Sequence, residues 1–354
     1  MLKRVKRVIK QEQYDYLARM DSLKEKGIAI NEAIRENIFA IITCINNDLP
    51  LFLYGSPGTG KTLSVRVVQS TIFGESSSDG FFRTLPELRI VDFQGTENTR
   101  SEEIEKAFEK ANNLLIKNKQ LDQKVKVVLI ADEMGLAEKS PHNPLKVLHE
   151  KLDPFYNLDR RREKPEGEKE EEKKKPAIKQ DDIVGFIGIS NYKLDLAKMS
   201  RTLVLARGDP PQKKLESTCI KLYEMLKGTQ EDCKELIKIF ALAFIKLKEE
   251  FRNEEGYRNW FANRDLYYAV RALAKEEYKT KINLASLKRL IYVNFGGAGR
   301  LLNHFSEVVI ARNVIQEAKA SSNVNISQLF SNINDEFKDF SLSEIMPLKI
   351  FQEA

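Results

Sequence analysis

The sequence predicts an α/β fold in which a mainly parallel sheet is flanked by helices, followed by a helical second domain. Short apolar runs alternate with helical patterns between residues 31 and 207, a glycine-rich segment joins the first run to the next helix, and the pattern beyond residue 212 is almost wholly helical. Strands that alternate with helices favour a parallel sheet, because helical crossovers connect parallel strands. The 354 residues exceed the usual domain length of about 100 to 200 residues, so two compact units are expected.

Composition argues against several classes of protein. With 42% hydrophobic and 31% charged residues the chain can bury a large core, unlike a disordered or fibrous protein. The net charge of +6 is too small an excess to indicate a nucleic-acid partner, and none is expected. Three cysteines without a CxxC spacing are typical of a reducing compartment and predict a cytoplasmic protein. No apolar run approaches the roughly 20 residues of a membrane span, so no transmembrane segment is expected.

The predicted elements follow one another in a regular order. An N-terminal linker or helix over residues 1–26 precedes a helix that Asn31 caps and Pro50 ends. Further helical patterns begin near Lys61 and at Ser101. The apolar runs that we interpret as strands cover residues 51–55, 88–93, 125–132, 182–190 and 202–206.

The domain boundaries are expected where these patterns change. The turn GDPPQ separates the two parts, which places the α/β domain at 27–208 and the helical domain at 209–354. Within the α/β part, residues 160–180 mix acidic and basic side chains without a hydrophobic period. Such a segment cannot bury a core, so a disordered, solvated insert is expected there rather than a binding element.

The glycine-rich segment after the first strand matches the GxxxxGK[ST] pattern of a P-loop. Glycines let backbone amides wrap phosphate oxygens, and the positive end of the following helix points at them. Lys61 is then expected to reach the β and γ phosphates of ATP, and Thr62 to offer its hydroxyl to Mg²⁺. The alternative is a glycine-rich turn with an incidental lysine. The predicted ATP-binding residues are Gly55, Ser56, Pro57, Gly58, Thr59, Gly60, Lys61, Thr62 and Leu63.

The third and fourth predicted strands each end in polar side chains. Asp132 and Glu133 close the third apolar run, and Asn191 follows the fourth. Ligands of open α/β sheets bind at the carboxyl ends of the strands, so these side chains should face the P-loop. Asp132 is expected to hold Mg²⁺, Glu133 to activate the attacking water and Asn191 to polarise it. Taken alone, such residues at a strand end are commonly solvated turns, so this interpretation depends on the P-loop.

The order of these parts resembles that of the AAA+ ATPases: a P-loop, an acidic pair on the third strand, an asparagine after the fourth, and a helical lid. The resemblance implies a five-stranded sheet of order 5-1-4-3-2, ATP bound between the α/β part and the lid, and neighbouring AAA+ units in a ring or pseudo-ring. Arg201 matches the place of the family's arginine finger, which acts on the neighbour's ATP, and Arg207 is a second candidate. Arg264 matches the lid arginine that contacts ATP.

Longer strings carry a narrower resemblance. GIAINEAIRENIF, ADEMGLAEKSPHNPLKVLHEKLDP and GFIGISNYKLDLAKMSR resemble one ATPase unit of the mysterin family, giant AAA+ and RING-finger E3 ubiquitin ligases. Asn263 departs from the family pattern, which usually has leucine before the lid arginine. The resemblance implies that the parent protein transfers ubiquitin and meets proteins of the ubiquitin pathway. Three cysteines and three histidines cannot supply the roughly eight zinc ligands of a RING, so this chain is expected to be a motor fragment or a short relative.

These patterns together predict ATP binding and hydrolysis, with ATP and Mg²⁺ as cofactors. The alternative is a nucleotide-gated structural unit that binds ATP and stabilises an assembly without appreciable turnover. The intact Glu133 favours the hydrolysing enzyme. An isolated chain that lacks a partner's arginine would nevertheless behave like the alternative.

Overall fold

The chain divides into two compact units by its internal contacts. The first comprises Met1–Lys26 with Glu32–Asp209, and the second comprises Gly27–Asn31 with Pro210–Ala354. The predicted insert at 160–180 lies outside the described residues. The computed structural model describes residues 2–20, 28–121, 124–152, 183–226, 230–251, 261–274, 284–295, 300–301 and 304–331.

The first unit contains a sheet with helices on both faces. Its strands are β1 (Leu51–Gly55), β2 (Glu87–Gln94), β3 (Val125–Asp132), β4 (Gly185–Ser190) and β5 (Leu203–Arg207). Its longer helices are α1 (Leu2–Ala18), α3 (Glu32–Asn46), α4 (Lys61–Gln69) and α6 (Ser101–Gln120). Its short helical turns are η1 (Gly74–Ser76), α5 (Gly80–Arg83), α7 (Met134–Glu138), η2 (Pro144–Lys146), α8 (Val147–Lys151) and α10 (Leu196–Met199).

The strands of this sheet lie in the order β2-β3-β4-β1-β5, and all neighbouring pairs are parallel. Read from the other edge, this is the order 5-1-4-3-2, so the prediction is confirmed. β1 lies between two strands that come much later in the chain, and its Leu53 pairs with Ile189 of β4 and Leu205 of β5. Because the strands are parallel, the carboxyl ends of β1, β3 and β4 meet at one edge.

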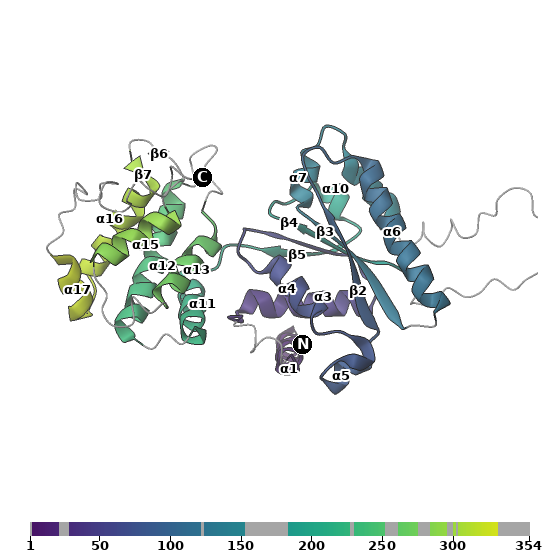
Figure 1. Cartoon of the computed structure of the whole chain (residues 1–354), viewed down its shortest axis with the longest axis horizontal. Coiled ribbons are helices and arrows are strands. Elements are labelled where there is room, and N and C mark those ends of the chain that lie inside the picture. The colour runs from purple at the N-terminus through teal and green to yellow at the C-terminus, as the bar shows by residue number, and fades with distance from the viewer. Residues whose placement is uncertain are drawn as a thin grey trace, which may run out of the picture. The chain divides into compact units, whose positions relative to one another are not determined.

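Alternation along the strands divides their side chains between two layers of helices. On β3, Val127 and Leu129 belong to the core beneath α6. The next residue, Ile130, is also buried, and because side chains alternate along a strand it points to the opposite face. Phe108 of α6 stacks on Phe186 of β4 with ring centroids 5.9 Å apart. Figure 1 shows α6, α7 and α10 on one side of the sheet and α3 and α4 on the other. α3 covers its face with a helical stripe of buried side chains: Ile34, Ile38, Ile41, Ile42 and Ile45.

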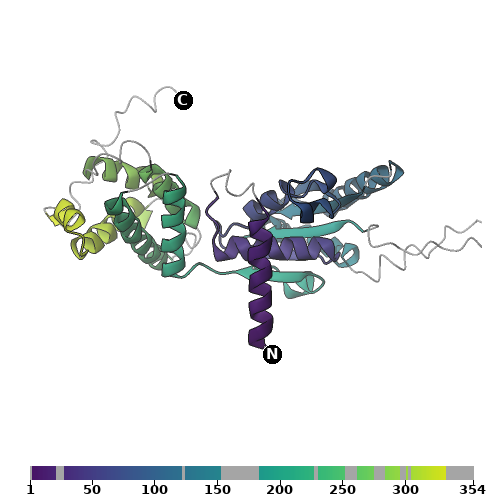
Figure 2. The same cartoon turned by 90° about the horizontal axis from the view of Figure 1, so that it is seen from below.

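α1 is attached to α3 through its carboxyl-terminal half. Arg35 of α3 is buried, and it donates from Nε to Gln13 Oε1 at 3.1 Å and from Nη1 to the Tyr14 hydroxyl at 2.9 Å. The ring of Tyr16 packs edge-on against Phe39 of α3, with centroids 5.7 Å apart. The amino-terminal half of α1 extends away from the rest of the first unit (Figure 2).

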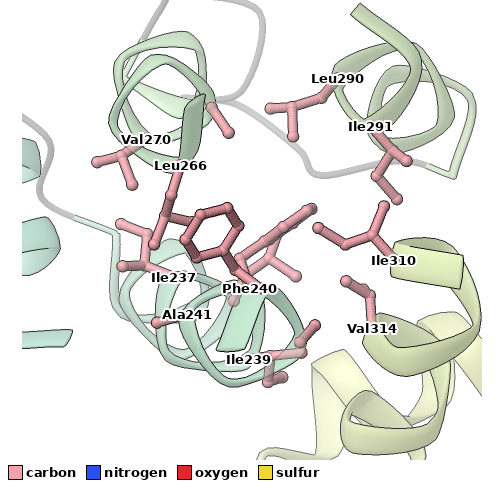
Figure 3. Close-up of a cluster of buried hydrophobic side chains, with 14 of the residues drawn as sticks. Ile237, Ile239, Phe240, Ala241, Leu266, Val270, Leu290, Ile291, Ile310 and Val314 are labelled. Carbon is pink, nitrogen blue, oxygen red and sulfur yellow. The ribbon is translucent and has the colours of Figure 1, made fainter. Parts of the chain in front are cut away.

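The second unit is built from helices around one apolar core. Figure 3 shows Phe240 of α12 among Leu266 of α13, Ile291 of α15 and Ile310 of α16. Two short strands, β6 (Arg300–Leu301) and β7 (His304–Phe305), pair antiparallel, and strands of this length leave no periodic pattern to predict them. The helices of this unit are α11 (Gln212–Met225), α12 (Glu231–Phe251), α13 (Asn263–Leu273), α15 (Leu284–Phe295), α16 (Ser306–Lys319) and α17 (Val324–Ser331).

None of the described helices of either unit has the length and apolar character needed to span a membrane.

We expect the second unit to depend on the packing of Phe240, which is 1% exposed. Phe240→Ala should lower the free energy of unfolding by about 3–5 kcal/mol, because it removes a buried ring and leaves a cavity. Val293→Ala on α15 is the control, because Val293 is 60% exposed, and its effect should stay within about 0.5 kcal/mol. Urea unfolding followed by circular dichroism measures both changes. Equal effects of the two substitutions would contradict this placement of the core.

Candidate functional site

The P-loop, Gly55–Thr62, connects β1 to α4 and packs between β5 and α3. At Gly55, where φ is 148°, an added Cβ would lie 1.9 Å from the carbonyl oxygen of Arg207 in β5. At Gly60, where φ is 80°, it would lie 2.6 Å from Cγ1 of Ile34 in α3. Backbone of this kind, with positive φ and no room for a side chain, requires glycine. The spacing of the glycines therefore reflects the close approach of two neighbouring elements as well as the curvature of the loop.

The remaining residues of the predicted loop close it or border it. The Thr59 hydroxyl donates to the carbonyl oxygen of Ser56 at 2.9 Å. Gly58 has a φ of 83°, and Pro57 beside it is partly exposed. Leu63, which the sequence also predicts to bind ATP, lies on the first turn of α4 and is 38% exposed.

Lys61 is the first residue of α4 and is buried. Its Nζ donates to the carbonyl oxygens of Gly55 at 2.6 Å and Ser56 at 3.1 Å, and to Oδ1 of Asn191 at 3.1 Å. These bonds use all three donors of the ammonium group. Burial lowers the pKa of Lys61 from 10.5 to about 8, and the two carboxylates that follow β3 offset part of this effect by raising it. The lysine therefore still carries its charge at neutral pH.

Thr62 and Asp132 offer oxygen ligands beside the loop. Thr62 Oγ1 donates to Asp132 Oδ2 at 3.1 Å, and the other oxygen, Oδ1, accepts a hydrogen bond from the backbone amide of Glu133 at 2.8 Å. The second contact orients the carboxylate so that one oxygen faces the loop. Hydroxyl and carboxylate oxygens suit Mg²⁺, whose neighbouring ligands lie about 3 Å apart in octahedral geometry. The pair fits a Mg²⁺ site that further oxygens, such as those of phosphates, would complete.

Glu133 and Asn191 are joined at the carboxyl ends of β3 and β4. Glu133 has a φ of 53°, an uncommon conformation for a residue with a side chain, and α7 begins directly after it. Asn191 Nδ2 lies 3.2 Å from each carboxylate oxygen of Glu133, while its Oδ1 accepts from Lys61. The asparagine therefore links the lysine and the glutamate in one network. A positive φ held at such a place is typical of functional sites.

Two residues of α3 that the sequence analysis does not assign to the site support the loop. Ile34 packs against Gly60, and Asn37, which is fully buried, places its Nδ2 3.5 Å from the carbonyl oxygen of Thr59. The polar side chain of Asn37 on the apolar face of α3 was the signal that could have identified it, because buried amides need specific partners.

The two arginines considered for the finger have different surroundings. Arg201 precedes β5, and its Nη1 lies 3.0 Å from Nδ1 of His149 on α8. Arg207 ends β5, and its side chain is 11% exposed. Its Nε donates to Asn37 Oδ1 at 2.7 Å and its Nη1 forms an ion pair with Glu36. Both arginines are thus contacted within their own unit, Arg207 by two side chains of α3 and Arg201 by His149.

Arg264, the predicted lid arginine, lies at the start of α13 in the second unit. Its side chain is 68% exposed, and its Nε lies 3.9 Å from Asp265 Oδ1. Asp265 in turn accepts a hydrogen bond from the Ala262 amide at 2.8 Å, which caps the helix. Asn263, where the family usually has leucine, is buried, and its Nδ2 has no hydrogen-bond partner within the part of the chain that the structure describes.

The strand order, the P-loop after β1 and the polar side chains after β3 and β4 define a P-loop domain of the AAA+ class. The model of the family described as "RNF213 AAA domain" matches residues 27–214. The chain belongs to this family, and the resemblance to mysterin is confirmed.

Curated relatives agree with the family assignment. The chain is 32% identical over 284 residues to "E3 ubiquitin-protein ligase rnf213-beta" of Danio rerio, which covers 80% of this chain and 5% of the relative. It is 31% identical over 273 residues to "E3 ubiquitin-protein ligase RNF213" of Mus musculus, with 77% of this chain and 5% of the relative covered. The Homo sapiens protein of the same name is 30% identical over 309 residues, or 86% of this chain and 5% of the relative. The chain thus spans about 5% of the length of these relatives.

We expect Gly55→Ala to destabilise the first unit, because the added Cβ would collide with the backbone of Arg207. The free energy of unfolding should fall by at least about 1–3 kcal/mol. Gly80→Ala in α5 is the matched control, since a Cβ there meets nothing within 4 Å. The control should be neutral or stabilising by up to about 1 kcal/mol. Thermal unfolding measures both, and a Gly55→Ala chain as stable as the control would show that the loop is not pressed onto β5.

Proposed function

We propose that this chain is an AAA+ unit that binds and hydrolyses ATP. The observation that carries the proposal is the network around Asn191, which contacts both Lys61 and Glu133. Beside it, Thr62 contacts Asp132. A phosphate-binding loop, a candidate metal site and a candidate general base therefore converge, which is the combination that phosphoryl transfer to water requires. A glycine-rich turn with solvated acidic residues would not need this arrangement.

Each of these residues has a role that its position supports. The loop amides and Lys61 bind the phosphates, and the lysine exchanges carbonyl partners for phosphate oxygens. Glu133 accepts a proton from the attacking water, and Asn191 orients that water. As Asn191 now holds both carboxylate oxygens of Glu133, the glutamate must leave this contact before it can act as a base.

ATP and Mg²⁺ are the proposed cofactors. Thr62 and Asp132 would hold the ion, and bound Mg²⁺ would neutralise charge on the transferred phosphoryl group. Leu63 borders the same loop on α4. Arg264 is proposed to contact ATP from the helical lid.

A neighbouring AAA+ unit, in a ring or pseudo-ring, is the proposed partner of this unit. Arg201 would act as a finger on the neighbour's ATP, stabilising charge in the transition state. To reach a neighbour, the guanidinium must exchange its contact with His149 for a contact outside its own unit.

A nucleotide-gated structural unit is the second candidate. Two contacts favour it, because each engages a proposed catalytic residue within its own unit. Arg201 contacts His149, and Glu133 contacts Asn191. Such a unit would bind ATP tightly and hydrolyse it only when a neighbour changes these contacts.

The names of the relatives support a proposal about the parent protein. Each of the three is called an E3 ubiquitin-protein ligase. We propose that this unit is part of the motor of such a ligase, whose partners include ubiquitin-pathway proteins. A cytoplasmic location is proposed from the free, buried thiols of Cys44, Cys219 and Cys233, which are typical of a reducing compartment.

The pKa of Lys61 predicts a pH dependence of nucleotide binding. The free chain holds a charged ammonium below about pH 8 and a neutral amine above it. Bound phosphates favour the charged form, so above pH 8 binding must take up a proton, and the affinity should fall by up to about tenfold per pH unit. Titration with a fluorescent ATP analogue between about pH 7 and 9.5 measures this, above the phosphate's own titration near pH 6.

Lys61→Arg is the control for this pH dependence, because arginine stays protonated across the whole range. Whatever its absolute affinity, the variant should show no loss of binding with rising pH. A constant affinity of the unmodified chain over the same range would contradict the proposed contact between Lys61 and phosphate.

Steady-state ATPase activity with Mg²⁺ tests the proposed function directly. Turnover should rise with protein concentration, because a neighbour completes the site. Glu133→Gln should lower kcat by about 10²–10⁴-fold while ATP still binds, because the general base is lost. Arg201→Ala should remove most turnover as well. Glu102→Gln on the exposed first turn of α6 is the matched control and should change nothing.

The outcomes separate the two candidate functions. ATP binding without turnover at any concentration would favour the nucleotide-gated structural unit. Turnover that is equal in Glu133→Gln and the unmodified chain would contradict both the assigned base and the reaction proposed for this site.

A further inference from the structure

Arg207 is a buried cation that none of the proposed catalytic roles explains. Its side chain is 11% exposed and contacts Glu36 and Asn37 of α3. The ion pair with Glu36 is only partly buried, because the Glu36 side chain is 34% exposed, and a pair of this kind adds little to stability. Stability alone therefore does not account for an arginine at the end of β5, and its contacts point to a positioning role.

Arg207 meets the P-loop by two routes. Its backbone pairs with Gly55, so closely that a Cβ on that glycine would lie 1.9 Å from the Arg207 carbonyl oxygen. Its Nε donates to Asn37 Oδ1 at 2.7 Å, and Asn37 Nδ2 lies 3.5 Å from the carbonyl oxygen of Thr59. Asn37 is fully buried and cannot exchange these partners for bulk water. A shift of Thr59 therefore changes the surroundings of Asn37, and through Asn37 it can reach Arg207.

The first unit ends two residues after Arg207, at Asp209. Gly208 and Asp209 are exposed, and a Cβ on Gly208 would meet no atom within 4 Å. The second unit resumes at Pro210. Arg207 is thus the last residue of β5, and it directly precedes Gly208–Pro210, here called the connecting segment.

We propose that Arg207 is a positioning residue that transmits nucleotide occupancy of the P-loop, through Asn37, to the connecting segment. The inference rests on the proposed binding of ATP and extends it to the regulation of that site. Phosphates that bind the loop amides would move the Thr59 carbonyl, and the rigid path from Asn37 to Arg207 would carry this change to the end of β5. The same path would let the position of the connecting segment alter the loop, because such coupling acts in both directions.

Hydrogen exchange of the full chain tests the path, with Mg²⁺ and a non-hydrolysable ATP analogue as the probe. In the unmodified chain the analogue should slow exchange in peptides from the P-loop and in a peptide covering residues 203–209, each by at least about threefold. Arg207→Met keeps the apolar stem but removes the guanidinium. In this variant the P-loop should still respond, whereas the response of the 203–209 peptide should fall to less than half, because only the backbone pairing with Gly55 remains.

Arg89→Met is the matched control, because it removes an arginine from the opposite edge strand, β2. Arg89 likewise contacts a glutamate and an asparagine, Glu87 at 3.1 Å and Asn118 at 3.0 Å, but neither side chain borders the P-loop. The control should keep both exchange responses. In ATPase assays Arg207→Met should lower kcat on the order of tenfold with little change in KM, whereas Arg89→Met should alter neither.

Asn37→Leu provides a second test that leaves Arg207 in place and remains available if Arg207→Met does not fold. It should weaken the same response of the 203–209 peptide to the same extent. The double variant should lose no more kcat than either single variant, because residues of one path are not additive. A response of the 203–209 peptide that stays undiminished in both single variants would overturn the inference while leaving ATP binding intact. A P-loop peptide of the unmodified chain that ignores the analogue would overturn the proposed function and this inference together.

Discussion

The ammonium group of Lys61 is buried where the P-loop, α4 and the end of β4 meet, and the arrangement of the site depends on keeping it charged. Two backbone carbonyls and Asn191 satisfy its three donors. A buried cation without such partners would lose its proton, because desolvation disfavours the charged form. The pKa of about 8 indicates that this balance is close, and phosphates would shift it towards the ammonium form. The groups that contact Lys61 therefore compensate only in part for the loss of water around its ammonium group.

Asn191 connects the ammonium group of Lys61 to the carboxylate of Glu133. One side of its amide accepts from Lys61, and the other donates to both carboxylate oxygens of Glu133. Any ligand that draws Lys61 away from Asn191 frees the amide to turn and loosens its hold on the glutamate. Under the proposed function, ligand binding and the release of Glu133 as a base would thereby be connected through a single side chain, which would keep the unit inactive until its loop is occupied.

α3 supports the site from the opposite side of the loop. Ile34 packs under Gly60, and Asn37 lies between Thr59 and the arginine that ends β5. The same helix also holds α1 through Arg35. Because the loop is pressed between α3 and β5, its conformation cannot change independently of these elements, and this rigidity is what makes a connection between the P-loop and the end of the first unit physically reasonable.

Patterns along the chain were enough to predict the strand–loop–helix order of the P-loop, the acidic pair at the end of the third strand and the parallel sheet, whose order followed from the family resemblance. Local patterns suffice there because periodicity and glycine spacing reflect backbone geometry over a few residues. The pairings of Asn191 emerge only when the chain is folded, because its partners Glu133 and Lys61 lie 58 and 130 residues away. The same holds for the contact of Arg207 with Asn37 of α3, 170 residues earlier in the chain. Such contacts depend on how strands and helices pack, and no pattern along the chain records which polar side chains that packing brings together.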